Sequence, residues 1–254
     1  MKLDRYAVIG NPVAHSRSPA IHAAFARQTG EPVAYERLLC PLDGFEPVVR
    51  EFAATGGRGC NITVPFKFET PRLARHCSER ARLAGAANVL RFDEDGWSAD
   101  NSDGVGLVRD IETGAGLPIA GRRVLLVGAG GAGAGVLGPL LAAGAAQVVV
   151  ANRTAEKARL LAESHAAWAR QHGAALAVAA WEAPGTAFDI VINASATSLQ
   201  GQASPVPPSV LAPGALAVDL MYGRSAEAFC FWRGVRPDTP PVLQMLRDEL
   251  AAGR

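Results

Sequence analysis

The strongest constraint on the fold is a stretch without any charged residue that runs from Val124 to Ala151. Its length would allow a membrane-spanning helix, but its internal order argues against one. The apolar run Val124–Val127 meets a cluster of glycines, a leucine-rich segment follows, and Val148–Val150 comes near the end of the stretch. Continuous apolar strands of this kind are typical of a buried parallel sheet. The sequence therefore predicts a strand–turn–helix–strand unit, and we expect no membrane partner.

The glycine cluster fits the pattern G-x-G-x-x-G, from Gly128 to Gly133. The pattern alone is weak, but here it directly follows a predicted strand and begins a predicted helix, which is its specific context. Backbone N–H groups at a helix N-terminus can face a pyrophosphate, and glycine lets the backbone approach it closely. An ordinary tight turn is the alternative. The residues expected to contact a dinucleotide are Gly128, Ala129, Gly130, Gly131 and Ala132.

The end of the next strand indicates which dinucleotide is bound. An NAD site usually places Asp or Glu there to bind the ribose 2′-hydroxyl. This chain instead has Asn152, Arg153 and Thr154, with Lys157 one turn later. A guanidinium can hold a 2′-phosphate through two hydrogen bonds, whereas a carboxylate would repel it. NADP is therefore the expected cofactor. The alternative is that Thr154 only caps a helix and the two cations are solvated.

Strand-like and helix-like segments alternate along the chain, which predicts an α/β fold with mainly parallel sheets in two domains. In the first, we expect strands at 6–9, 33–39 and 59–64, helices at 18–28, 43–55 and 79–84, and a hairpin that opens at 87–92. In the second, we expect strands at 123–127, 147–151, 176–179, 190–193 and 215–220, after a helix-like link at 104–112. Residues 1–103 with 226–254 should form a substrate and catalytic domain, and residues 104–225 a Rossmann-type dinucleotide-binding domain. The helical C-terminal tail should pack back on the first domain.

Charge and cysteine content narrow the functional class further. The formal net charge of +1 gives no reason to expect nucleic acid or an anionic membrane as a partner. The cysteines lie far apart, at Cys40, Cys60, Cys77 and Cys230, without a C-x-x-C pair or clustered histidines. We therefore expect neither a metal site nor a disulfide framework, and reduced thiols fit a cytoplasmic protein. The charged N-terminus without an apolar run predicts no signal peptide.

Segments rich in hydroxyl and amide groups occur at predicted strand ends, where α/β sheets bind ligands. They are Gly10–Pro19, Asn61–Lys67, Ala87–Val89 and Asp100–Gly106. The period-two alternation of a strand places Asn61 and Thr63 on one face. Each polar residue also has an ordinary structural explanation, such as a helix cap at Ser18 or a turn cap at Asn88. Convergence of all four segments beside a nicotinamide would instead make a substrate site.

Taken in order, these motifs resemble those of the shikimate dehydrogenase family. They are G-N-P-x-A-H-S-x-S-P, N-[IV]-T-V-P-F-K, A-x-N and D-N-[ST]-D-G-x-G, followed by G-A-G-G-A, N-R-T, I-N-A-[ST], D-L-M-Y and G-V-x-P-D, and they span almost the whole chain. The resemblance implies an oxidoreductase that acts on a CH–OH group. It would transfer hydride reversibly between NADPH and the small molecule 3-dehydroshikimate, giving shikimate for chorismate and aromatic amino-acid biosynthesis. A monomer or a homodimer is expected.

The resemblance also implies roles for individual residues. Lys67 and Asp103 match the catalytic pair, in which the lysine moves the proton at the C3 oxygen and the aspartate orients it. Ser16 and Ser18 match the serines that bind the substrate carboxylate. Further substrate contacts correspond to Asn61, Thr63, Asn88 and Tyr222, and positions beside the nicotinamide correspond to Ser195 and Met221.

The chain departs from the family pattern after Tyr222. That pattern continues with a helix, a strand and a last helix that supplies a substrate-binding glutamine, and this segment has no counterpart around Gly223–Ser225. Gln244 is no substitute, because it lies in the terminal helix. The segment is either truly deleted or skipped in the sequence. Two rivals remain: a quinate/shikimate dehydrogenase that prefers NAD, and a nucleotide-binding relative impaired by the loss. Retention of Lys67 and Asp103 argues against the second.

Overall fold

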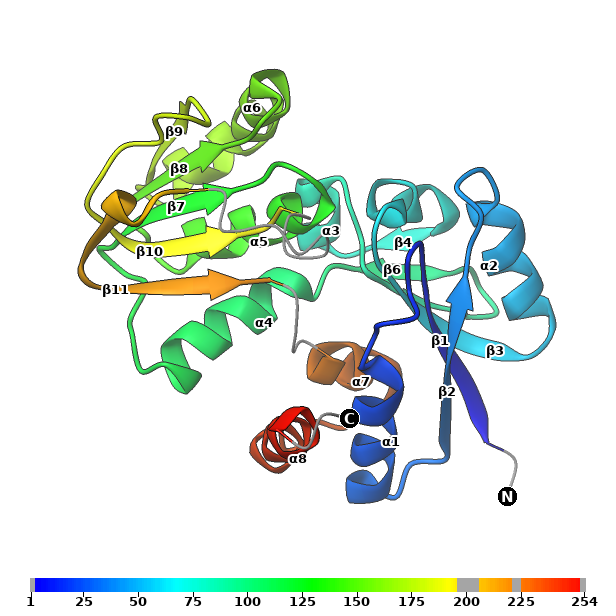
Figure 1. Cartoon of the computed structure of the whole chain (residues 1–254). Coiled ribbons are helices and arrows are strands. Elements are labelled where there is room, and N and C mark those ends of the chain that lie inside the picture. The colour runs from blue at the N-terminus through cyan, green and yellow to red at the C-terminus, as the bar shows by residue number, and fades with distance from the viewer. Residues whose placement is uncertain (1–2, 196–205, 221–224, 252–254) are drawn as a thin grey trace. The chain divides into compact units, whose positions relative to one another are not determined.

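The computed structural model describes residues 3–195, 206–220 and 225–251. The chain divides into two compact units, each with its own sheet (Figure 1). Unit 1 comprises Met1–Ser78, Ala87–Ser102 and Gly223–Arg254, and unit 2 comprises Glu79–Ala86 and Asp103–Tyr222. Both sheets are covered by helices, so the expected α/β class with two domains is confirmed.

The sheet of unit 1 has six strands in the order β2-β1-β3-β5-β6-β4. They are β1 (Asp4–Gly10), β2 (Val33–Leu39), β3 (Gly57–Ile62), β4 (His76–Cys77), β5 (Val89–Arg91) and β6 (Ser98–Asp100). The central strand β1 is parallel to β2 and β3, while β5 is antiparallel to both β3 and β6. The carboxyl ends of β1, β2, β3 and β6 and the start of β5 therefore lie at one edge of the sheet, which we call the polar edge of unit 1.

The helices of unit 1 are α1 (Ser18–Thr29), α2 (Phe45–Ala54), α7 (Ser225–Arg233) and α8 (Pro240–Ala251), with 3-10 turns at Phe66–Phe68 and Thr70–Leu73. The C-terminal tail packs back on this unit, as expected, because α7 places Phe229 against Phe25 of α1 and stacks Trp232 on Tyr6 of β1. The indole nitrogen of Trp232 donates to the carbonyl oxygen of Leu90 over 2.9 Å. A Cβ atom on Gly59 would lie 2.7 Å from that nitrogen, so glycine makes room for the tail.

The sheet of unit 2 has five parallel strands in the order β11-β10-β7-β8-β9. They are β7 (Arg123–Val127), β8 (Gln147–Ala151), β9 (Ala175–Ala179), β10 (Phe188–Asn193) and β11 (Leu211–Asp219). The helices are α3 (Glu79–Ala84), α4 (Asp103–Arg109), α5 (Gly131–Ala142) and α6 (Ala155–Gln171), with a π-helical turn at Asp110–Gly114 and a 3-10 turn at Pro208–Val210. The chain order places a topological switch between β7 and β10, where doubly wound sheets bind ligands.

The uncharged stretch divides as the sequence predicts, into β7, the glycine turn, α5 and β8. Val124–Val127 and most of α5 are buried in one hydrophobic core. Within the described part of the chain, no helix combines the length and the apolar character needed to cross a membrane.

Residues 79–86 differ from the expected division, because they belong to unit 2 rather than to the first domain. The reason is close packing on α5: a Cβ atom on Gly138 would lie 2.7 Å from Cδ2 of Leu83 in α3. Helix α4 approaches the same helix, where a Cβ atom on Gly104 would lie 2.4 Å from Cγ of Pro139. Glycines at 104 and 138 thus allow α3 and α4 to cover α5.

Strands β11 and β4 also differ from the expectation. Strand β11 begins at Leu211, before the expected 215, although Pro213 and Gly214 are typical of turns. It pairs only with β10 among the described strands, and an edge strand tolerates proline. The pairing of β10 with β11 shifts register between Phe188 and Ile190, opposite the part of β11 that contains Pro213 and Gly214. The short strand β4 was not expected at all.

Candidate functional site

The loop after β1 brings the two predicted carboxylate-binding serines together. Ser16 and Ser18 are half-buried, and their hydroxyl oxygens lie 3.1 Å apart. Arg37 of β2 fixes the loop by donating from Nε and Nη2 to the carbonyl oxygen of Ser16, at 2.9 and 2.6 Å. Helix α1 has Arg17 as its N-cap, without a side-chain capping bond. The helix-cap explanation for Ser18 is therefore wrong, and its hydroxyl belongs to the polar edge.

Asn61 of β3 and Asn88, which directly precedes β5, meet at the same edge. The amide nitrogen of Asn61 donates to the carbonyl oxygen of Asn88 over 3.2 Å. The side chain of Asn88 is engaged with Ser102, whose backbone N–H donates to Oδ1 of Asn88 over 2.8 Å. Thr63 follows β3, and a Cβ atom on Gly10 would lie 2.2 Å from its Cγ2 atom. Glycine at position 10 thus lets the two loops converge.

The predicted catalytic residues fall in different units. Lys67 is half-buried in the 3-10 turn Phe66–Phe68, and its carbonyl oxygen accepts from the N–H of Ala87 over 2.9 Å, next to Asn88. Asp103 is the first residue of α4 in unit 2 and is 8 % exposed. The contact between Lys67 and Asp103 stays a prediction.

The segment before Asp103 is held by buried hydrogen bonds. Oδ1 of Asp100 accepts from the hydroxyl of Ser78 over 2.6 Å and from the N–H of Asn101 over 2.8 Å. Asp100, Asn101 and Ser102 are almost fully buried. Buried polar groups require partners, so these bonds fix the path of the chain that leads into Asp103.

The glycine turn at the end of β7 has the shape of a phosphate cradle. Gly128 has φ of +112°, a conformation that favours glycine, and its N–H donates to the carbonyl oxygen of Ala151 over 2.8 Å. A Cβ atom on Gly133 would lie 2.1 Å from the carbonyl oxygen of Gly128, whereas one on Gly130 would meet nothing within 4 Å. The turn therefore packs tightly against α5 on one side and is open at Gly130, where the helix N-terminus can receive a pyrophosphate.

The loop after β8 joins the glycine turn to the predicted 2′-phosphate residues. Oδ1 of Asn152 accepts from the N–H of Ala129 over 3.0 Å, and its Nδ2 donates to the carbonyl oxygen of Thr154 over 2.8 Å. Arg153, Thr154 and Lys157 are exposed. Thr154 precedes α6 without a side-chain capping bond, so its hydroxyl is not used as the cap that the alternative explanation requires. A cationic, carboxylate-free loop fits an NADP 2′-phosphate.

Ser195 lies across the topological switch from the glycine turn. Oδ1 of Asn193 accepts from both the N–H and the hydroxyl of Ser195, at 3.1 and 2.6 Å. Nδ2 of Asn193 donates to Asp219 of β11 over 2.9 Å. A Cβ atom on Gly128 would lie 2.9 Å from the backbone nitrogen of Ser195, so the two loops adjoin. Met221 and Tyr222, both predicted site residues, lie outside the described residues.

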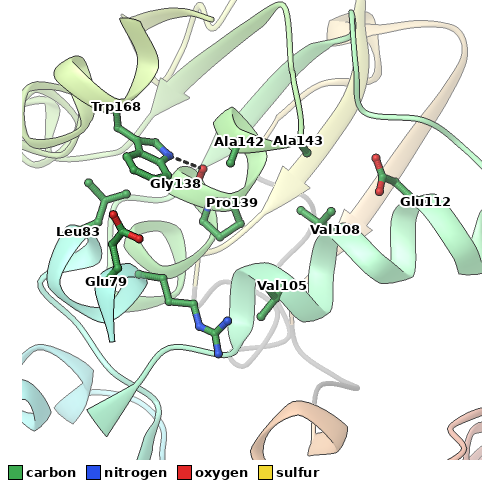
Figure 2. Close-up of a pocket in the computed structure, with 11 residues that line it drawn as sticks. Glu79, Leu83, Val105, Val108, Glu112, Gly138, Pro139, Ala142, Ala143 and Trp168 are labelled. Carbon is green, nitrogen blue, oxygen red and sulfur yellow. Dashed lines mark hydrogen bonds between the residues drawn. The ribbon is translucent and has the colours of Figure 1, made fainter. Parts of the chain in front are cut away.

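A cavity of about 370 Å³ in unit 2 is lined by α3, α4, α5 and α6 (Figure 2). Its lining is mainly apolar, and Nε1 of Trp168 donates to the carbonyl oxygen of Gly138 at its wall. Gly138 lies seven residues along α5 from Gly131, roughly 10 Å from the phosphate cradle at 1.5 Å per residue. The cavity is therefore distinct from the cradle. Across the described residues, no cluster of three or more His, Cys, Asp or Glu side chains could hold a metal.

The structure adds three residues to the predicted site: Tyr35, Ser102 and Asn193. The hydroxyl of Tyr35 donates to Oδ1 of Asn61 over 2.6 Å. Ser102 and Asn193 lie in the D-N-[ST]-D and I-N-A-[ST] motifs that the sequence brings out, and could have been selected from them. For Tyr35 the sequence offers no such signal, because its role depends on the register of β2 and β1.

Comparison with known proteins gives two matching family models. Residues 8–90 match the shikimate dehydrogenase substrate binding domain, and residues 112–201 match the shikimate / quinate 5-dehydrogenase model. The two matched ranges lie mainly in unit 1 and wholly in unit 2, respectively.

Relatives match along almost the whole chain. The shikimate dehydrogenase (NADP(+)) of Acidovorax sp. (strain JS42) is 54 % identical, covering 98 % of both chains. That of Aromatoleum aromaticum (strain DSM 19018 / LMG 30748 / EbN1) is 48 % identical over 283 positions, covering 100 % of both. Because this chain has 254 residues, at least 29 of those 283 positions have no counterpart in it. This chain is therefore shorter than that relative within the aligned region, as the missing segment predicts.

Solved structures agree in fold. An Ael1 enzyme from Pseudomonas putida is 41 % identical, covers 96 % of this chain and 98 % of its own, and has a TM-score of 0.81. Shikimate 5-dehydrogenase of Thermus thermophilus, solved in complex with NADP(H) and shikimate, is 30 % identical, with coverages of 93 % and 96 % and a TM-score of 0.80. The chain therefore belongs to the shikimate dehydrogenase family.

Proposed function

We propose that this protein is an NADP-dependent shikimate dehydrogenase, which interconverts 3-dehydroshikimate and shikimate. The observation that carries the proposal is the polar edge of unit 1, where serine hydroxyls, two asparagine amides and Thr63 gather beside the turn of Lys67. A small polyhydroxylated ring acid needs such neutral donors and acceptors. Unit 1 then serves as the substrate and catalytic domain and unit 2 as the nucleotide-binding domain.

NADPH supplies a hydride from C4 of its nicotinamide to the C3 carbonyl carbon of the substrate. Lys67 donates the proton to the C3 oxygen during reduction and takes it back during oxidation, and Asp103 orients the ammonium group. The hydroxyls of Ser16 and Ser18 donate to the carboxylate. The remaining ring contacts are assigned to Asn61, Thr63, Asn88 and Tyr222.

The nucleotide is assigned to unit 2. Residues 128–132 face the pyrophosphate, Asn152 fixes the turn through Ala129, and Ser195 and Met221 flank the nicotinamide. Arg153, Thr154 and Lys157 hold the 2′-phosphate. The exposed cations and the absence of a carboxylate from residues 152–154 favour NADP over NAD.

Two alternatives yield different results in one assay. A quinate/shikimate dehydrogenase that prefers NAD would turn over at least as fast with NAD as with NADP. A nucleotide-binding relative without activity, which the 29 unmatched positions favour, would bind NADP without any turnover. The assay incubates the purified protein with shikimate and either nucleotide, and follows the near-ultraviolet absorbance of the reduced cofactor. We expect turnover with NADP that exceeds turnover with NAD.

The variant Lys67→Ala tests the catalytic assignment. Because the lysine moves a proton in the transition state, we expect kcat to fall by roughly 10²–10⁴-fold with a much smaller change in the KM for shikimate. Arg72→Ala is a matched control, since it removes an exposed cation from the neighbouring 3-10 turn. An unchanged kcat in Lys67→Ala would exclude the lysine from the mechanism.

A further inference from the structure

The phenol of Tyr35 lies among the residues assigned to the substrate, although it belongs to none of the motifs. It stands in β2, and its hydroxyl donates to Oδ1 of Asn61 over 2.6 Å. This bond connects β2 with the end of β3, across the central strand β1 of the sheet.

The ring of Tyr35 is held in place by aromatic packing. It stacks on the imidazole of His22 with the ring centroids 4.2 Å apart and the planes at 9°. Trp232 of the C-terminal tail lies on the same cluster, 6.2 Å from the Tyr35 ring. A ring fixed in this way presents its hydroxyl in one position, which is what a rigid reference point for other side chains requires.

The hydroxyl in turn selects one orientation of the Asn61 amide. Burial raises the pKa of Tyr35 well above its usual value, so the phenol stays protonated and can donate. With the amide oxygen facing Tyr35, the amide nitrogen donates to the carbonyl oxygen of Asn88 over 3.2 Å. If the amide were flipped, its oxygen would face the carbonyl oxygen of Asn88, and both atoms are acceptors. The observed orientation leaves one N–H of Asn61 for a ligand.

We propose that Tyr35 is a positioning residue for the substrate, which acts by fixing the amide of Asn61. The inference rests on the proposed function, because it assigns that amide to a ring hydroxyl of shikimate. Tyr35 itself does not contact the reacting atoms. Its loss should therefore affect substrate binding more than the chemical step.

The variant Tyr35→Phe removes the hydroxyl and keeps the ring and its stacking. We expect the KM for shikimate to rise roughly tenfold, the scale of a lost hydrogen bond that leaves a partly buried acceptor unsatisfied. The KM for NADP should stay the same, and kcat should change less than the KM for shikimate. Tyr6→Phe is the matched control: its ring also belongs to this aromatic cluster, 4.6 Å from Trp232, but its hydroxyl faces Arg233.

A double-mutant cycle separates positioning from a general structural role. If Tyr35 acts through Asn61, adding Tyr35→Phe to Asn61→Ala should raise the KM for shikimate by less than it does in the wild type. Three outcomes would overturn the inference: an unchanged KM in Tyr35→Phe, an equal rise in Tyr6→Phe, or full additivity in the double variant. A wild-type protein without turnover contradicts the proposed function and, with it, this inference. An active wild type with an unaffected Tyr35→Phe variant contradicts the inference alone.

Discussion

Arg153 is the residue on which the cofactor preference depends most. It is exposed directly after Asn152, whose side chain is tied to the glycine turn. The variant Arg153→Asp replaces a donor to the 2′-phosphate by a charge that repels it, so we expect the KM for NADP to rise about 10- to 100-fold. The KM for NAD should not rise, because NAD has no 2′-phosphate.

The control for this prediction is Arg159→Ala. Arg159 is an exposed arginine of the same unit, but it is paired with Glu156 and Glu163 along α6. Its removal should leave the ratio of the two KM values unchanged. Steady-state kinetics with both nucleotides provide the measurement, and an equal loss for NADP and NAD in Arg153→Asp would contradict the 2′-phosphate assignment.

His22 makes a residue-scale prediction about stability and pH. The imidazole is fully buried, and burial lowers its pKa from 6.5 to about 3, an effect that Asn61 offsets in part. The other groups against the ring are the aromatic side chains of Phe25, Tyr35, Phe229 and Trp232. Protonation is thus disfavoured in the folded state. The stability that the neutral His22 contributes is complete above pH 6.5, and it is lost progressively as the pH falls toward 3.

From pH 7 to pH 5 this single group should lower the free energy of unfolding by about 2 kcal/mol. The measurement compares urea unfolding of the wild type and His22→Phe at the two pH values. Phenylalanine fits the aromatic surroundings and cannot be protonated, so the variant should lose about 2 kcal/mol less than the wild type. Equal losses in both proteins would show that His22 is not responsible.

At the scale of elements, two glycines between β7 and the first turn of α5 have different roles, one in packing and one in ligand binding. A Cβ atom on Gly133 would collide with the carbonyl oxygen of Gly128, and one on Gly130 would enter open space. Gly133→Ala should therefore cost about 1–3 kcal/mol of stability. Gly130→Ala should stay within about 0.5 kcal/mol of the wild type, while its affinity for NADP falls because the methyl group occupies the space proposed for the pyrophosphate.

Thermal unfolding and calorimetric titration with NADP measure the two effects separately. A Gly130→Ala variant that binds NADP as tightly as the wild type would place the pyrophosphate elsewhere. Unchanged stability of Gly133→Ala would show that the turn can move away from α5.

The elements that the sequence predicts well are those with a strong local signal. β7, α5 and β8 follow from buried apolar runs around a glycine turn, and the loops at the polar edge follow from their clustered hydroxyl and amide groups. Elements that depend on tertiary packing cannot be predicted in this way. Residues 79–86 join unit 2 through contacts on Gly138, and β4 has only two residues. Tyr35 is one of several side chains along β2, and its contact with Asn61 is seen only in the folded chain.

At the scale of the whole molecule, the central question is whether a chain that is shorter than a relative within the aligned region is catalytically active. The relative from Aromatoleum aromaticum aligns over 283 positions with this chain of 254 residues. Each unit nonetheless forms its own sheet, and α7 and α8 pack on unit 1. We therefore expect the shorter chain to fold cooperatively and to retain the catalytic pair in a working state.

The most direct measurement is the kcat of the unmodified protein for shikimate oxidation, with the NADP affinity determined on the same sample. The account predicts tight binding of NADP together with a kcat of about 1–10³ s⁻¹, the ordinary range of enzymes. NADP binding without detectable turnover, in a sample that unfolds cooperatively, would contradict it.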